Sequence, residues 1–132
     1  MLAWNFGTRR IGPVNATILM SCMPVAAYSY RVAQGYTLLI TEVMANPEAV
    51  TDAAGEWVEI NNASGRVLNL AECRLTDRRF QSDLGDITLS PGEYAVFGRN
   101  ADENLNGGVS VQGTFNFALD NGGDRLSIRC AD

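Results

Sequence analysis

The chain has 132 residues, 46% of them hydrophobic and 19% charged, which fits a single globular domain and leaves no room for a second one. Its formal net charge is −5, and it contains neither lysine nor histidine, so every cationic side chain is an arginine. This acidic balance argues against nucleic-acid binding, because phosphate backbones are repelled. The absence of histidine excludes histidine-dependent catalytic triads and histidine metal ligands.

Residues 1–35 have the composition of an export leader. Arg9 and Arg10 give a basic start, no acidic residue precedes Glu42, and the twelve residues 16–27 are uncharged. This run is shorter than the roughly 20 residues that cross a bilayer, but it fits the apolar part of a secretory signal. We therefore expect a signal peptide or a disordered leader, no transmembrane segment, and a secreted, extracellular or cell-surface protein. An extra strand of the domain is the alternative interpretation.

The leader also contains Leu19-Met20-Ser21-Cys22, which resembles a bacterial lipobox. In that alternative, Cys22 would carry a lipid and become the mature N-terminus of an anchored protein. Small residues at positions 25–27 and 33–35 would instead suit the peptidase that removes an ordinary secretory signal. The sequence leaves the cleavage site open between these positions.

From residue 36 onward, short apolar runs alternate with turn residues, and no helical period is sustained. This pattern predicts seven or so strands, within residues 37–44, 56–60, 67–70, 73–77, 87–89, 94–97, 114–119 and 125–130. We expect a loop or ragged hairpin at 78–86, a long polar loop at 99–113 and a hairpin turn at 120–124. Residues 36–132 are thus predicted to form an all-β sandwich or barrel. The chain ends just after its last expected strand, so we expect the natural protein to continue.

Short sequence blocks follow one another along residues 38–130: ITEVMANP (40–47), GEWVEI (55–60), Asn62 with LNL (68–70), LTD (75–77), LSPGEYAV (89–96), GRN (98–100) and LDNGGDRL (119–126). Together these blocks resemble the lamin tail domain family, in its bacterial, secreted branch. The resemblance implies an immunoglobulin-like β-sandwich of the lamin-tail type that lacks its last strand. The chain departs from the family pattern at Asn61, where an aromatic residue is common, and at Glu72-Cys73, where Gly-Trp is common.

The resemblance also carries an expectation about function. In bacteria the family occurs in exported proteins, often beside nucleases or phosphoesterases, and is regarded as a binding or adhesion module. We expect a non-catalytic extracellular module that contacts protein or glycan on the cell surface. The alternatives are an accessory domain of a larger secreted nuclease or phosphoesterase with domains beyond Asp132, and a nucleic-acid-binding or assembly module as in lamins.

Cys73 and Cys130 are the only cysteines after the leader, and both lie in predicted strands. In an exported protein, two such cysteines most simply form one disulfide. Two buried free thiols are the alternative.

Asp102, Asn104 and Asn106 match the first half of a calcium loop, D-x-[DN]-x-[DN]-G. The twelfth position of that motif is Gly113 and not the usual bidentate glutamate. Asn, Asp and Gly also fill ordinary loops, so the ordinary loop is the favoured interpretation. No cofactor is expected, and calcium is the candidate if one is present.

Glu42, Glu56 and Glu59 lie on two strands that are expected to pair, where they could form an acid–base couple or a metal site. Strand alternation favours a different interpretation, in which these carboxylates lie on the wet face of the sheet. Glu59 is expected to organise a turn or to pair with an arginine such as Arg99. We expect at most one exposed side chain among the strand aromatics Trp57, Tyr94, Phe97, Phe115 and Phe117.

Overall fold

The computed structural model of the protein describes residues 4–5, 18–19 and 37–131. The lipobox cysteine Cys22 and nearly all of the expected export leader lie outside these residues. Only two short strands, β1 (Trp4–Asn5) and β2 (Ile18–Leu19), are described in the first 36 residues. No helix in the described part of the chain is long and apolar enough to cross a membrane.

The first sheet has the strand order β1-β3-β4-β9-β10. Its neighbouring strands are antiparallel except β9 and β10, which run parallel. Besides β1, its members are β3 (Leu38–Met44), β4 (Trp57–Asn62), β9 (Tyr94–Gly98) and β10 (Gly113–Thr114). A single helical turn, α1 (Asp52–Gly55), connects β3 to β4.

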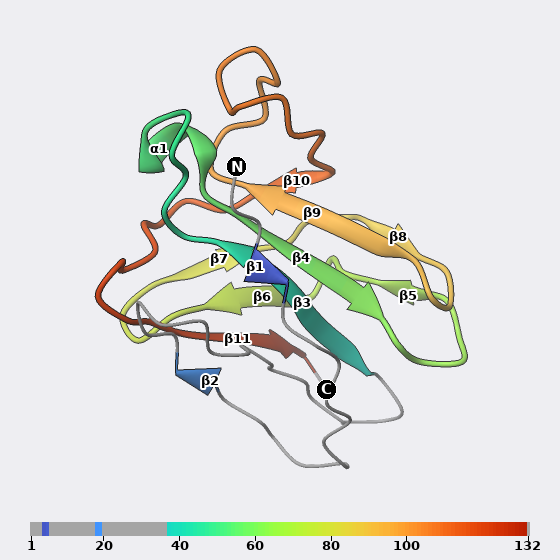
Figure 1. Ribbon diagram of the computed structural model, residues 1–132. Coiled ribbons are helices and arrows are strands. Elements are labelled where there is room, and N and C mark those ends of the chain that lie inside the picture. The colour runs from blue at the N-terminus through green and yellow to red at the C-terminus, as the bar shows by residue number, and fades with distance from the viewer. Residues whose placement is uncertain (1–3, 6–17, 20–36, 132) are drawn as a thin grey trace.

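The second sheet has the strand order β2-β11-β6-β7, and every pair in it is antiparallel. Besides β2, its members are β11 (Arg125–Cys130), β6 (Cys73–Thr76) and β7 (Gln81–Asp83). Two further strands, β5 (Leu68–Asn69) and β8 (Thr88–Leu89), form a small antiparallel pair. The two larger sheets lie one in front of the other (Figure 1), so the predicted all-β, immunoglobulin-like sandwich is confirmed.

Side chains that point inward from the two sheets form one hydrophobic core. Ile40, Val58 and Phe97 of the first sheet and Leu75 and Leu126 of the second are almost completely buried in it. Along β11, buried and more exposed side chains alternate, as expected for a sheet with one dry and one wet face. The core therefore fixes which side chains of the second sheet point outward to solvent.

A β-bulge at Thr41 interrupts the pairing of β3 with β4. Ile40 lies opposite Ile60, and the next paired residue, Glu42, lies opposite Glu59. One extra residue on β3 shifts the alternation, so Ile40 and Val43 both face the core although they are three positions apart. This local irregularity could not be read from simple period-two alternation.

The predicted strand over residues 114–119 and its hairpin with the last strand are wrong. Only Gly113–Thr114 is a strand, and β11 pairs with β6 of the other sheet. The segment between them crosses from the edge of the first sheet to the second (Figure 1). Its burial still alternates, because Phe115, Phe117 and Leu119 insert into the core while Asn116 remains exposed. Hydrophobic alternation thus arose from core insertion and not from strand pairing.

Candidate functional site

Cys73 and Cys130 form a disulfide in the structure, as predicted. The two residues lie opposite each other on the paired strands β6 and β11. The bond joins positions that are 57 residues apart in the sequence, so it covalently fixes the last described strand to the middle of the domain. The second sheet, which we call the platform, is therefore crosslinked between β6 and β11.

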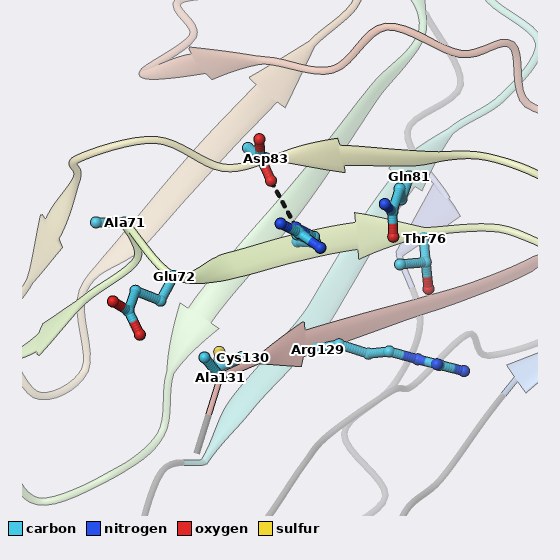
Figure 2. Close-up of a pocket in the computed structure, with 9 residues that line it drawn as sticks. Ala71, Glu72, Thr76, Gln81, Asp83, Arg129, Cys130 and Ala131 are labelled. Atoms are coloured by element: carbon cyan, nitrogen blue, oxygen red, sulfur yellow. Dashed lines mark hydrogen bonds and ion pairs between the residues drawn. The ribbon is translucent and has the colours of Figure 1, made fainter.

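A polar hollow of about 590 Å³ lies on the outer face of this platform. Figure 2 shows its lining side chains on β6, β7, β11 and the segments next to β6 and β11. Its volume lies within the range of small-molecule and glycan sites in proteins. The lining residues are Ala71, Glu72, Arg74, Thr76, Gln81, Asp83, Arg129, Cys130 and Ala131, and we call this hollow the sheet groove.

Two arginines and one carboxylate cross the sheet groove in one row. In the strand register Arg129 lies opposite Arg74, and Arg74 lies opposite Asp83. Arg74 Nε lies 2.7 Å from Asp83 Oδ1, the ion pair that is dashed in Figure 2. Arg129 extends along β11, away from Cys130 (Figure 2), and no carboxylate of the described residues forms an ion pair with it. The groove therefore contains one neutralised cation and one that is not.

A second row, next to the arginines, consists of neutral hydrogen-bonding groups. Thr76 lies opposite Ser127 on one side and Gln81 on the other. The hydroxyl oxygens of Thr76 and Ser127 are 2.6 Å apart, and Gln81 is exposed. Thr76 is buried and its hydroxyl is engaged with Ser127, so the Gln81 amide is the exposed hydrogen-bonding group beside the charged row.

Glu56 is buried, not on the wet face as predicted. Its side chain is 1% exposed, and Oε2 accepts hydrogen bonds from Arg99 Nη1 at 3.2 Å and from the Leu119 backbone N–H at 3.1 Å. Oε1 has no hydrogen-bond partner. Burial raises the pKa of Glu56 to about 7, while the Leu119 N–H and Arg99 act in the opposite direction. The expected pairing of Glu59 with Arg99 is therefore wrong, because Glu56 takes that arginine.

Glu42 and Glu59 do lie directly opposite each other on β3 and β4. Glu59 Oε1 accepts a hydrogen bond of 2.6 Å from the Thr41 hydroxyl at the bulge. Burial, and then the charge of Glu59, raise the pKa of Glu42 above its usual value. Glu56 lies on the inner face and forms its own ion pair, so the three carboxylates do not converge.

Most of the predicted calcium-loop side chains form hydrogen bonds within the loop. Asp102 Oδ1 accepts from the backbone N–H and the side-chain amide of Asn104, at 2.9 and 3.0 Å. Asn106 is buried, donates to the carbonyls of Asn100 and Val109, and accepts from the Val109 N–H. Calcium binding stays a prediction, and any ion would compete with these bonds. The described residues contain no group of three or more Cys, Asp or Glu residues that could hold a metal.

The aromatic side chains follow the prediction. Tyr94 is 57% exposed, whereas Trp57, Phe97, Phe115 and Phe117 are buried. None of the five lines the sheet groove. The groove is therefore a hydrogen-bonding and charged surface without an aromatic platform.

Asn62 belongs to one of the sequence blocks that resemble the lamin tail domain, and its hydrogen bonds in the structure account for its place there. It is completely buried, its side-chain amide donates to the carbonyls of Arg66 and Leu89, and its oxygen accepts from the N–H and hydroxyl of Ser64. Asn62-Ala63-Ser64 also fits a glycosylation sequon. With every polar atom of the side chain engaged, Asn62 has a structural role in the folded domain.

The fold is an immunoglobulin-like β-sandwich whose second sheet carries a disulfide between its strands β6 and β11. The family model of the lamin tail domain matches residues 31–132. The chain therefore belongs to the lamin tail domain family. No curated protein and no solved structure matches it.

The sequence did not reveal the sheet groove. Arg74 and Arg129 are 55 positions apart, and only the register of β6 against β11 brings them together. Both residues do alternate with buried neighbours in the sequence, which marks them as outward-facing. The sequence pattern therefore indicates that both arginines point outward, but it does not indicate that they lie close together.

Proposed function

We propose that this domain is a non-catalytic binding module of an exported bacterial protein, which holds its ligand in the sheet groove. The observation that carries the proposal is the groove itself: charged and neutral hydrogen-bonding side chains on three paired strands that are fixed by a disulfide. Side chains on strands are held more precisely than those on loops, which favours recognition of an extended ligand.

Export is supported by the chemistry of the disulfide and by the composition of the leader. Disulfides form and persist in oxidising compartments outside the cytosol. Mass spectrometry of the mature protein from a bacterial host tests this part of the proposal. A mature N-terminus after residues 25–35 agrees with a secretory signal, a lipidated Cys22 agrees with an anchored form, and an exported protein that begins at Met1 contradicts both.

Binding is tested with the fluorescently labelled domain on washed bacterial cells and on isolated envelope polysaccharide. The double variant R74Q/R129Q removes both groove cations, and R66Q serves as a control that removes an arginine outside the groove. We expect saturable binding that the double variant loses and the control keeps. Absence of binding, or equal binding by the wild type and R74Q/R129Q, contradicts the proposal.

A further inference from the structure

The arginines of the described domain gather around the sheet groove. Of the seven arginines between residues 37 and 131, five lie on β6, β11 or the loop from β6 to β7, namely Arg74, Arg78, Arg79, Arg125 and Arg129. The domain as a whole is acidic, so this region is an exception to its surface. An anionic group approaching the domain therefore meets attraction at this sheet and repulsion from the acidic remainder.

Arg129 lies opposite Arg74 in the strand register, and its side chain extends along β11, away from Cys130 (Figure 2). Like charges directly opposite each other on neighbouring strands are destabilising. Asp83 neutralises Arg74 through Nε only, which leaves the Nη groups of Arg74 outside that ion pair. Arg129 is exposed and no described carboxylate forms an ion pair with it, so its guanidinium is available to a bound anion.

The charge balance of the groove selects the kind of anion. Glu72 and Asp83 offset Arg74 and Arg129, so the four charged lining residues sum to zero. A polyphosphate or nucleic-acid backbone, with its dense charge, would meet both carboxylates and gain little. One carboxylate per repeating unit would pair with Arg129, and hydroxyl groups beside it would find the exposed amide of Gln81.

We infer that the sheet groove binds an acidic polysaccharide that carries one carboxylate per sugar unit, as in uronic-acid polymers. Arg129 contacts the carboxylate, Arg74 contacts the same or the next acidic sugar, and Gln81 contacts hydroxyl groups. The inference rests on the proposed binding function and names the ligand class for it.

The test is a titration of the folded domain with polygalacturonate and alginate oligomers, which carry one carboxylate on every sugar, followed by calorimetry or fluorescence. Each oligomer is compared with its methyl-esterified form, which keeps the sugar and removes the charge. We expect at least one acid form to bind and its ester to bind at least about tenfold more weakly, as for loss of one charged hydrogen bond. R129Q should show a similar loss and R129K a smaller one, because lysine keeps the charge without the planar fork. R66Q should change the affinity less than about twofold.

Other outcomes overturn the inference. Equal binding of acid and ester, or tighter binding of polyphosphate or single-stranded DNA, shows that the carboxylate is not what the groove recognises. Failure of every uronic polymer, together with groove-dependent binding of whole cells, overturns the ligand class and leaves the proposed function standing. Failure of both experiments, with wild-type folding verified by its melting temperature, overturns both.

Discussion

Glu56, the residue that precedes β4, forms an ion pair with Arg99, the residue that follows β9, with 3.2 Å between Oε2 and Nη1; the Glu56 side chain is buried and that of Arg99 is partly exposed. The same oxygen accepts the N–H of Leu119 in the crossing segment, and the Arg99 N–H donates to the Glu56 carbonyl at 2.9 Å. One carboxyl group thus connects three chain segments that are far apart in sequence. Its protonation state should therefore affect the stability of the whole domain.

Replacing Glu56 with glutamine should remove a pH dependence of stability. The pKa of Glu56 is raised to about 7, so between pH 4.5 and 7 the folded protein keeps a proton that the unfolded chain releases. This group therefore stabilises the fold below pH 4.5, and its contribution is lost as the pH rises through 7, by about 3 kcal/mol in all. Urea unfolding from pH 4 to 8.5 gives the free energy of unfolding of the wild type and of E56Q. The difference between the two values should shift in favour of E56Q as the pH rises.

The exposed residue Glu48 provides the control for this experiment. E48Q should follow the wild-type curve across the whole pH range. A constant difference between E56Q and the wild type from pH 4 to 8.5 would show that Glu56 does not titrate in this range. E56A, which leaves the buried Leu119 N–H without its acceptor, should lose about 1–3 kcal/mol.

The Cys73–Cys130 disulfide should provide a large part of the stability of the domain. A crosslink over 57 positions restricts the unfolded chain and is worth about 4 kcal/mol in the chain-entropy model. C73A/C130A should therefore unfold at a clearly lower urea concentration than the oxidised wild type. Two free thiols in native, unreduced protein, or equal midpoints for the two proteins, would refute this role.

Gly55 is needed because no side chain fits at its position. A Cβ there would clash with Val50 Cγ2 and lie 2.9 Å from Pro47 Cβ. G55A should cost about 1–3 kcal/mol through overpacking, as measured by thermal or urea unfolding. Gly65 is the matched control, since a Cβ there meets nothing within 4 Å and G65A should change stability by less than about 0.5 kcal/mol. Equal effects of the two variants would show that the contact at Gly55 can relax.

Asn62 should tolerate no substitution that removes its amide. N62A leaves the carbonyls of Arg66 and Leu89 without a donor, and a buried unsatisfied group costs about 1–3 kcal/mol. The exposed residue Asn69 is the control, and N69A should cost less than about 1 kcal/mol. A melting temperature for N62A that equals that of N69A would contradict the structural role. In a glycosylating host, the folded domain should leave Asn62 unmodified.

The sequence predicted most of the strands, because turn residues and period-two alternation mark them directly. It could also have placed Glu56 on the inner face, since Glu56 has the same parity as Val58 and Ile60. The crossing segment was different: Phe115 and Phe117, with ring centroids 5.1 Å apart, alternate as a strand would but insert into the core without a partner strand. Pairing between distant segments is a tertiary property that alternation alone does not specify.

Residue-by-residue NMR of the domain, titrated with the uronic-acid oligomer that binds most tightly, tests the central claim most directly. The account predicts that amide and guanidinium shifts change on β6, β7 and β11, centred on Arg74, Gln81 and Arg129, and that R129Q removes them. Changes confined to the 99–113 loop, or to the edge of the other sheet, would contradict the assignment of the sheet groove as the binding site.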